Sequence, residues 1–308
     1  MIAVTMIDVR PASAAGAAAA GAAATRRRVD ELADHAVAAL TAEATLTPKP
    51  GLVDLRGPGA HDDMDVETLI RSAESLRGTF RELAAAGVGS RPGPDLRERL
   101  AEIGRRGEAA MMAATGGVNT HRGAIWALGL VVAAAAADPT GTPGDLVASA
   151  AATALHPDRR APQPTTPGSL VRARYRVPGA VGEAQAGFPH AILGLDTMRA
   201  RLAAGAPPTE AHLDALLAIV AVLDDTCLLH RGGVHGLRAA QVGASRALDL
   251  GGASTAAGAL ALARLDAQLT GSRLSPGGSA DLLALALLLH ALESAPLDTS
   301  HPILRKDT

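Results

Sequence analysis

The spacing of apolar residues constrains the fold of this chain more than any other feature of its sequence. Between residues 66 and 84, apolar side chains recur every three or four positions, which places them on one face of a helix. The same spacing continues over 96–111. No stretch shows the alternation of polar with β-branched or aromatic residues that is typical of a strand. We therefore predict an all-α fold.

The composition supports one large domain of closely packed helices. Aromatic residues make up only 1% of the chain, so its core must consist mainly of Ala and Leu. We predict a single all-helical catalytic domain over residues 29–300, with ligand-binding loops at helix ends. Further helices are predicted at 29–45, 122–137, 143–155, 183–204, 209–226, 234–250, 254–270 and 278–293.

Two segments lie outside this helical pattern. Residues 1–28 are rich in Ala and Gly and end in three arginines, whereas a secretory signal carries its positive charge before its apolar run. We predict a disordered leader there and a cytoplasmic protein. Five prolines fall within 157–179. This segment is predicted to be irregular, either separating two lobes or forming a flap over a site.

Charge and cysteine content exclude several classes of function. The formal net charge is −2, so the chain has no overall field that would attract nucleic acid or an anionic membrane surface. The longest apolar run, 123–137, is too short to span a bilayer comfortably. Cys227 is the only cysteine, and we interpret it as a small packing residue rather than a nucleophile. These features favour an enzyme acting on small molecules.

The loop TPKPGLVD (47–54) places a cation and a carboxylate on a rigid turn. Lys49 lies between two prolines, which restrain the backbone on both sides of it. We predict that Lys49 and Arg122 are phosphate clamps rather than solvating surface cations. Replacing either with Ala should then change stability little, because surface substitutions usually stay within about 0.5 kcal/mol.

The loop GAHDDMD (59–65) concentrates negative charge. Its three carboxylates repel one another unless they are solvated, cap a helix or bind a cation. Taken alone, the pattern favours Asp63 or Asp65 as the cap of the helix that starts near Val66. The alternative, a magnesium site, stays open.

The loop TGGVNTHRG (115–123) leads into a helix. Backbone N–H groups at such an entrance, with the positive end of the helix dipole and a nearby arginine, suit phosphate oxygens. Glu108 lies on the preceding helix. This segment therefore predicts a phosphate site.

Two further loops carry polar residues. Asp224 and Asp225 come after a very apolar helical segment, where a carboxylate pair would oppose the helix dipole, and this placement favours magnesium or substrate binding. Arg231 is close behind them in the sequence and offers a second phosphate clamp. The turn SPGGSAD (275–281) is equally consistent with a Ser-capped helix start and with ligand contact.

At these segments the chain resembles the triphosphoribosyl-dephospho-CoA synthase family. The resemblance implies that ATP and 3'-dephospho-CoA give 2'-(5''-triphosphoribosyl)-3'-dephospho-CoA and adenine. It also implies that this product passes to a carrier-protein transferase. The product would be the precursor of the prosthetic group on the acyl carrier subunit of malonate decarboxylase or citrate lyase. The matching stretches are TPKPGLVD (47–54), GAHDDMD (59–65), GEAAM (107–111), ATGGVNTHRGAIWALGL (114–130), GEAQAGFP (182–189), DDTCLLHRGG (224–233) and SPGGSADLLA (275–284).

This reaction requires a general base for the ribose 2'-hydroxyl, help for the leaving adenine, and cations that hold the triphosphate without cleaving it. As catalytic residues we predict Asp63, Glu108, Asp225 and His121. For nucleotide binding we predict Lys49, Gly51, Asp54, His61, Gly116, Gly117, Asn119, Thr120, Arg122, Arg231, Gly232, Ser275, Gly277 and Gly278. For magnesium we predict Asp224, Asp225, Asp63 and Asp65, and the residues alone do not separate base from metal ligand.

Two other classes of function stay open. A magnesium-dependent hydrolase of an N-glycosidic bond would use the same residues, with water as the acceptor in place of dephospho-CoA. A non-catalytic module that docks a carrier protein would need no carboxylate pairs at helix ends, so the pairs argue against it.

Overall fold

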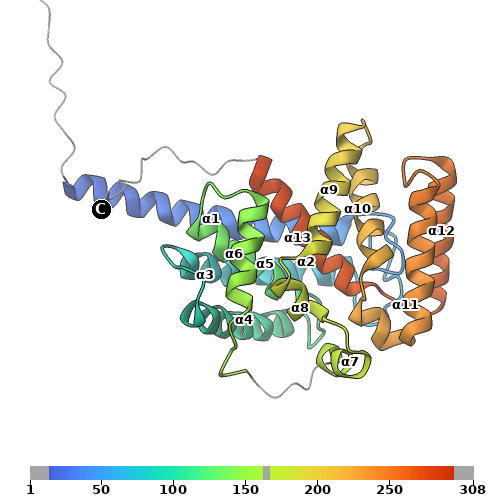
Figure 1. The fold of residues 1–308 in the computed structure, drawn as a ribbon, viewed down its shortest axis with the longest axis horizontal. Coiled ribbons are helices and arrows are strands. Elements are labelled where there is room, and N and C mark those ends of the chain that lie inside the picture. The colour runs from blue at the N-terminus through green and yellow to red at the C-terminus, as the bar shows by residue number, and fades with distance from the viewer. Residues whose placement is uncertain (1–13, 162–166, 295–308) are drawn as a thin grey trace, which may run out of the picture.

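The computed structural model describes residues 14–161 and 167–294, which form thirteen helices and no strand (Figure 1). The all-α prediction is thus confirmed. The helices are α1 (Ala14–Thr45), α2 (Val66–Ser75), α3 (Arg77–Gly87), α4 (Pro94–Ala114), α5 (Arg122–Ala137), α6 (Pro143–Ala154), α7 (Pro167–Tyr175), α8 (Gly179–Gln185), α9 (Pro189–Ala203), α10 (Pro208–Val222), α11 (Thr226–Asp249), α12 (Ala256–Gly271) and α13 (Gly277–Ser294).

Helices α5 and α13 lie at the centre of the molecule. Both are apolar on nearly every face, and a helix of this kind is stable only when neighbours surround it. Helix α5 contacts α1, α3, α4, α6 and α8, and α13 contacts α1, α6, α9, α10 and α11. The two central helices also pack against each other, so they join the two halves of the chain.

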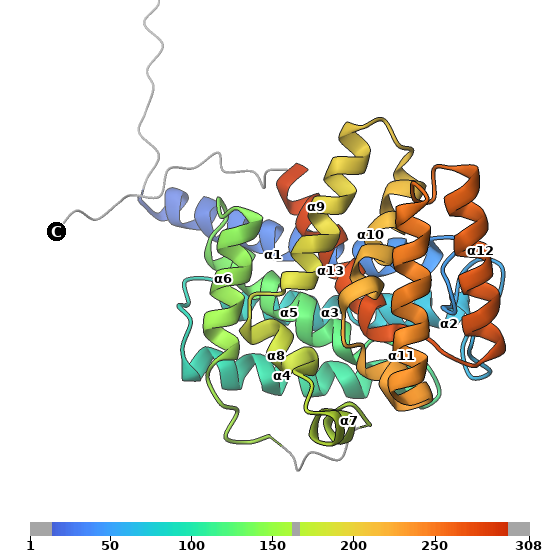
Figure 2. The same cartoon turned by 45° about the vertical axis from the view of Figure 1, so that its right-hand side comes forward.

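The remaining helices form two groups around this pair. One group contains α3, α4 and α6, which pack against α5, and the other contains α9 to α12, while α1 contacts both central helices. In both cartoon views α4 and α6 lie to the left and α10 to α12 to the right (Figures 1 and 2). Helix α7 lies at the lower edge, against α11 and α8. One hydrophobic cluster includes buried residues from Val29 to Leu289, so the core is continuous across both groups. None of the described helices is long and apolar enough to cross a membrane.

Two predicted helices are each broken in two. The predicted helix over 66–84 ends at Ser75 and restarts at Arg77, with Leu76 between them. No residue type there marks the break. The predicted helix over 183–204 is interrupted at Phe188, which has a φ of 56°. Pro189 explains this break, because a proline disfavours helical geometry in the residue before it.

The predicted leader and the Pro-rich segment are both more helical than expected. Helix α1 begins at Ala14, because Ala is the best helix former and the helix over 29–45 simply extends backwards through it. Residues 1–13 lie outside the described part of the chain. Within 157–179, Pro167 starts α7, where a proline at the first helical position costs nothing. The prediction of irregular structure is therefore wrong for 167–175, and 162–166 are not described.

The packing of α3 against α5 depends on a missing side chain. A Cβ atom at Gly87 would lie 2.1 Å from the backbone oxygen of Ala133 in α5, and the α5 backbone has no room to move. In the same helix, Gly78 has no atom within 4 Å of its Cβ position. We expect Gly87→Ala to lower the free energy of unfolding by about 1–3 kcal/mol through overpacking.

Gly78→Ala is the matched control, and we expect it to keep or raise stability, since Ala favours a helix by about 1 kcal/mol over Gly. Urea denaturation of the two variants beside the parent protein measures both effects. Equal stabilities for the two variants would show that this close contact of α3 with α5 does not exist.

Candidate active site

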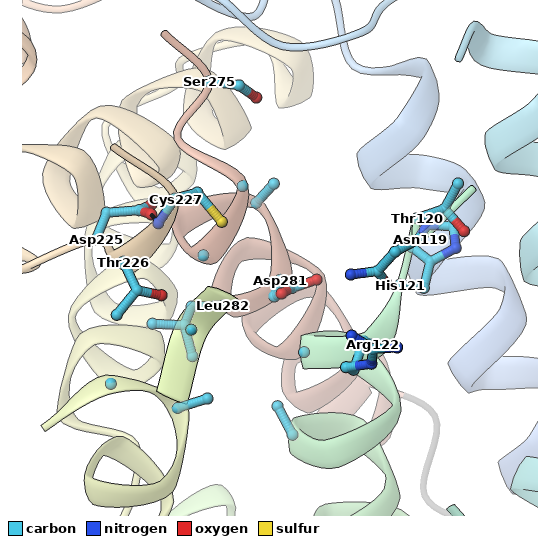
Figure 3. Close-up of a pocket in the computed structure, with 18 of the residues that line it drawn as sticks. Asn119, Thr120, His121, Arg122, Asp225, Thr226, Cys227, Ser275, Asp281 and Leu282 are labelled. Atoms are coloured by element: carbon cyan, nitrogen blue, oxygen red, sulfur yellow. Dashed lines mark hydrogen bonds between the residues drawn. The ribbon is translucent and has the colours of Figure 1, made fainter. Parts of the chain in front are cut away.

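A pocket of about 620 Å³ opens where the two groups of helices meet. The loop over 46–65 forms one wall, and the first residues of α5, α11 and α13 form the floor. Helices α7 and α8 contribute a further wall. Figure 3 shows residues from α5, α11 and α13 facing one another across this space. Segments that lie far apart in the sequence are thus brought to one place.

Most of the residues predicted for the site line this pocket. They are Lys49, His61, Asp63, Glu108, Asn119, Thr120, His121, Arg122, Asp224, Asp225, Arg231, Ser275, Gly277 and Gly278. The predicted residues outside its lining are Gly51, Asp54, Asp65, Gly116, Gly117 and Gly232.

Two of the carboxylates outside the pocket organise the chain around it. Asp65 is the N-cap of α2 and accepts a 2.8 Å hydrogen bond from the backbone N–H of Thr68. Asp54 accepts hydrogen bonds from the backbone N–H of Lys49 and from the guanidinium of Arg56, at 2.9 and 2.6 Å. The prediction of metal or nucleotide contact is replaced by capping for Asp65 and by loop bracing for Asp54.

The predicted glycines outside the pocket allow close contacts or backbone turns. Gly51 has a φ of 69°, and a Cβ there would lie 2.4 Å from the backbone oxygen of Leu274. A Cβ at Gly232 would lie 2.5 Å from the Leu274 side chain. Gly116 and Gly117 form an exposed turn with φ of 66° and 94°. Their predicted phosphate contacts are not supported by where they lie, since this turn is not part of the cavity lining.

Asp225 caps two helices with one buried carboxylate. It accepts hydrogen bonds from the N–H groups of Cys227 and Leu228 at the start of α11. It also accepts from the N–H and the hydroxyl of Ser279 in α13, both at 2.8 Å. Gly278 allows this approach, because a Cβ there would lie 3.2 Å from the carboxylate.

The sequence predicts that Asp225 lies at the C-terminal end of a helix, where its charge would oppose the dipole and favour magnesium binding. The structure does not have this arrangement. Helix α10 ends at Val222 and α11 begins at Thr226, so the Asp225 carboxylate lies at a helix N-terminus, where negative charge is favourable. Burial raises the pKa of Asp225, and its hydrogen bonds oppose that shift. The role that the geometry supports is positioning of the pocket floor.

A second carboxylate, Asp281, lies at the N-terminus of α5. His121 is the N-cap residue of α5, but its side chain makes no hydrogen bond to the first turn of the helix. Asp281 of α13 accepts a hydrogen bond from the Ala124 N–H instead. A Cβ on Gly123 would lie 2.0 Å from the Asp281 carboxylate, so this position requires glycine. The helix end predicted to hold phosphate is thus occupied by a carboxyl group of the protein.

The environment of Asp281 favours its neutral form. Burial, followed by the nearby Glu43 and Asp225 carboxylates, raises the pKa of Asp281 well above its ordinary value. The side chain nevertheless faces the pocket, toward His121 and Arg122 (Figure 3). Asp281 is absent from the residues that the sequence predicts, because a single Asp in the first turn of an apolar helix looks like a cap.

Lys49 is buried rather than exposed. Only 1% of its side chain is accessible, and its Nζ donates to the carboxylate and the backbone oxygen of Glu43, both at 2.6 Å. Glu43, which the sequence does not predict for the site, is also buried on α1 and also lines the pocket. The expectation of a harmless surface substitution at Lys49 is therefore wrong. The expectation of a small stability change fits Arg122 better, since Arg122 and its partner Glu108 are each about one-third exposed.

His121 presents a free nitrogen to the pocket. Its Nδ1 lies 2.8 Å from the Ser72 hydroxyl, which in turn lies 2.6 Å from the Thr120 hydroxyl. Its Nε2 is buried and has no hydrogen-bond partner among the described residues. Burial and the charge of Lys49 lower the pKa of His121 to about 4. At neutral pH the ring is therefore an uncharged hydrogen-bonding group held in one orientation.

His61 joins the loop over 59–65 to the far side of the pocket. Its Nε2 lies 2.9 Å from the Ser275 hydroxyl, and Arg231 approaches its Nδ1 to 3.3 Å. Burial and the charge of Arg231 lower the pKa of His61. The Asp63 carboxylate lies 3.3 Å from the same His61 Nδ1 and is exposed on the pocket lining.

Glu183 of α8 is buried, lines the pocket and pairs with the half-buried His190 of α9. Glu183 accepts hydrogen bonds from both the N–H and the ring Nδ1 of His190, at 2.9 and 2.7 Å. The bond to Glu183 raises the pKa of His190. Glu183 belongs to the stretch GEAQAGFP, and its pairing across the break at Phe188 is not visible from sequence spacing.

Metal binding by protein side chains alone finds no support in the described residues. No group of three or more of their His, Cys, Asp and Glu side chains lies close enough to hold an ion. Asp63 and Asp224 are exposed carboxylates on the pocket lining. Burial raises the pKa of the Cys227 thiol, which agrees with a packing role for this residue.

Comparison with known proteins identifies relatives over most of the chain. The profile of the family described as ATP:dephospho-CoA triphosphoribosyl transferase matches residues 29–299. A probable 2-(5''-triphosphoribosyl)-3'-dephosphocoenzyme-A synthase from Pseudomonas fluorescens is 53% identical over 86% of this chain and 92% of its own length. The synthase of that name from Klebsiella pneumoniae is 50% identical over 85% of this chain and 94% of its own. No solved structure matches the chain significantly.

The Lys49–Glu43 pair yields a prediction on stability. Removing one member of a buried ion pair leaves an uncompensated charge, which costs roughly 3–5 kcal/mol. We expect Lys49→Met to lower the free energy of unfolding by about this amount, and we expect the double variant Glu43→Gln with Lys49→Met to recover part of the loss.

Arg122→Gln is the matched control, because a partly exposed pair contributes only about 0–1 kcal/mol. Chemical denaturation of the three variants gives the comparison. If Lys49→Met were as stable as Arg122→Gln, Lys49 would be a solvated surface cation after all.

Proposed function

The chain belongs to the ATP:dephospho-CoA triphosphoribosyl transferase family, and we propose that this transfer takes place in the pocket at the first turns of α5, α11 and α13. The enzyme moves the triphosphoribosyl group of ATP to dephospho-CoA. Adenine leaves from the anomeric carbon, and the product is 2'-(5''-triphosphoribosyl)-3'-dephospho-CoA.

One observation supports the pocket as the place of reaction. The stretches that carry the family resemblance are separated by up to about 230 residues, yet residues from every one of them line a single cavity. A cavity of about 620 Å³ is within the usual size of a site for small ligands.

The bond changes define what the side chains must do. The bond between adenine and the ribose C1' breaks, and a bond from the acceptor 2'-oxygen to C1' forms. The 2'-hydroxyl loses a proton, and the leaving adenine gains one. Positive charge develops on the donor ribose in between, so carboxylates near C1' stabilise the transition state.

We propose that Asp281 donates the proton that the leaving adenine gains. Burial and its negative neighbours raise the pKa of its carboxyl group, which favours the protonated form that a general acid needs. The N–H of Ala124 fixes its orientation at the end of α5. After donating, the carboxylate lies at a helix N-terminus that stabilises its charge.

We assign recognition of the nucleotide to His121. Its neutral ring and unpartnered Nε2 allow a hydrogen bond to the adenine or the ribose. The contact with Ser72 fixes the ring, so little freedom is lost on binding. Asp63 and Glu108, which also line the pocket, remain the proposed bases for the 2'-hydroxyl.

We propose that magnesium binds to the protein together with the triphosphate of ATP. Mg²⁺ keeps several waters and commonly takes only one or two protein carboxylates together with substrate phosphates. Asp63 and Asp224 fit such a site, since both are exposed on the pocket lining. The ion would neutralise part of the triphosphate charge.

The product is a precursor that has to be attached to a protein. We propose that a carrier-protein transferase consumes it, with the acyl carrier subunit of malonate decarboxylase or of citrate lyase as the final acceptor. We also propose a cytoplasmic location, since ATP and dephospho-CoA are both cytoplasmic metabolites.

Adenine release tests the transfer directly. The protein is incubated with ATP and magnesium, with or without dephospho-CoA, and adenine and the coupled product are measured by mass spectrometry. We expect adenine to appear in step with the product and only when the acceptor is present. Equal release without dephospho-CoA would identify a hydrolase instead.

Substitution of Asp281 tests the general acid. We expect Asp281→Asn to slow the transfer by about 10²–10⁴-fold, because it cannot donate the proton. In the parent enzyme the rate should fall as pH rises through the raised pKa of Asp281, and the variant should lack that fall. The rate is followed as adenine release between pH 6 and 9.

Stability separates this role from a structural one. Because the pKa of Asp281 is higher in the folded than in the unfolded protein, stability falls as pH rises above the unfolded value. Asp281→Asn avoids that loss and should be at least as stable as the parent at pH 8. Asp62→Asn, exposed at the surface, is the control and should match the parent in rate and stability. A variant of Asp281 with normal activity would remove it from the mechanism.

A further inference from the structure

The cations that line the pocket fall into two classes. Lys49 and Arg122 are already paired with Glu43 and Glu108. Arg231 and Arg172, by contrast, have no carboxylate partner among the residues that the structure describes. Arg231 donates only to the backbone oxygens of Ala60 and Arg273 and to the His61 ring.

Arg172 is held in place although its charge is unpaired. Its Nε atom is buried without a hydrogen-bond partner in the described structure. Its aliphatic stem lies over Gly179, where a Cβ atom would come within 2.6 Å of the Arg172 Cδ. A buried donor without a partner costs free energy, so this arrangement suits an anion that arrives with a ligand.

Helix α7 separates the main pocket from a second cavity. Arg172 lines the main pocket, whereas Leu170, Val171, Arg174 and Tyr175 of the same helix line a cavity of about 430 Å³ against α11. His230, which precedes Arg231, lines both cavities and marks where they meet. The unpaired cations therefore lie beside a cavity whose lining is partly apolar and partly polar.

A kink in α11 shapes this second cavity. Gly233 has φ 58° and ψ −159°, values that only glycine adopts readily, and they interrupt the helix. A Cβ at Gly233 would lie 3.5 Å from the hydroxyl of Tyr175. The kink therefore faces Tyr175 of α7, and Gly233 and Leu229 of α11 both line the cavity.

The two substrates differ in the groups attached beyond their phosphates. The triphosphate of ATP ends in a free phosphoryl group. The diphosphate of dephospho-CoA continues into a pantetheine arm that is long, uncharged and partly apolar. Two unpaired cations next to a cavity with a mixed apolar and polar lining match the second substrate, whose uncharged arm carries both apolar and polar groups, and not the first.

We propose that Arg172 and Arg231 bind the diphosphate of dephospho-CoA and that the cavity between α7 and α11 receives its pantetheine arm. This assignment rests on the proposed function, since it presupposes dephospho-CoA as the acceptor. Helix α7 is then the element that distinguishes the acceptor site from the donor site.

Calorimetric titration of matched arginine variants tests the clamp. Arg172→Gln and Arg176→Gln remove the same charge from the same segment, but Arg176 lines neither cavity. Losing a charge-assisted hydrogen bond weakens binding by roughly 10–100-fold. We expect this loss for dephospho-CoA with Arg172→Gln only, while a non-hydrolysable ATP analogue binds both variants as it binds the parent.

The cavity between α7 and α11 has its own test. Leu170 is 61% exposed, so Leu170→Asp puts a charge at the mouth of the cavity with little risk to folding. Leu260→Asp on α12, at 53% exposure, is the control. We expect Leu170→Asp to weaken dephospho-CoA binding at least about tenfold, roughly the 1.4 kcal/mol that corresponds to one decade in Kd, and Leu260→Asp to leave it unchanged.

The outcomes distinguish a failure of this inference from a failure of the proposed function. If the parent protein neither binds dephospho-CoA nor forms product, the proposed function fails. If the parent does both and Arg172→Gln binds dephospho-CoA normally, only the acceptor site is wrong. A loss confined to the ATP analogue would assign Arg172 to the donor triphosphate and would equally overturn the inference.

Discussion

The architecture of the pocket depends on two carboxylates placed at helix N-termini. Asp225 joins the first turns of α11 and α13 through four hydrogen bonds, and Asp281 reaches from α13 to the first turn of α5. The starts of three helices are thereby held together. Because the helix dipoles point their positive ends at this place, the protein gathers negative groups here at a lower cost than elsewhere in its core.

This arrangement explains why the most apolar helices carry the chemistry. Helices α5 and α13 are buried on nearly all sides, so their first turns are fixed by packing, and any side chain there is held rigidly. The same burial raises the pKa of the Asp281 carboxyl group and lowers that of the His121 ring. Rigid orientation and altered pKa values thus have one origin, the close packing of the central pair.

The sequence predicts the helices well and the contacts between them poorly. Helix α5 has the predicted bounds of 122–137, because its apolar composition is continuous and its polar flanks are sharp. Asp225 does line the pocket, but for a different reason than expected, since spacing alone does not locate the boundary between α10 and α11. Glu43 and Asp281 are not predicted at all. Each lies on a helix whose pattern looks ordinary, and each gains its role only from a partner elsewhere in the chain: α5 for Asp281, and the loop at Lys49 for Glu43.

A crystal structure with a non-hydrolysable ATP analogue and dephospho-CoA bound together tests the central claim most directly. The reaction centre proposed here lies between the free Nε2 of His121 and the carboxyl group of Asp281. We therefore expect the donor C1' and the acceptor 2'-oxygen to lie in that space, within contact distance of both side chains. Nucleotide bound instead on the exposed turn at Gly116 and Gly117, with the floor of the pocket unoccupied, would contradict the account.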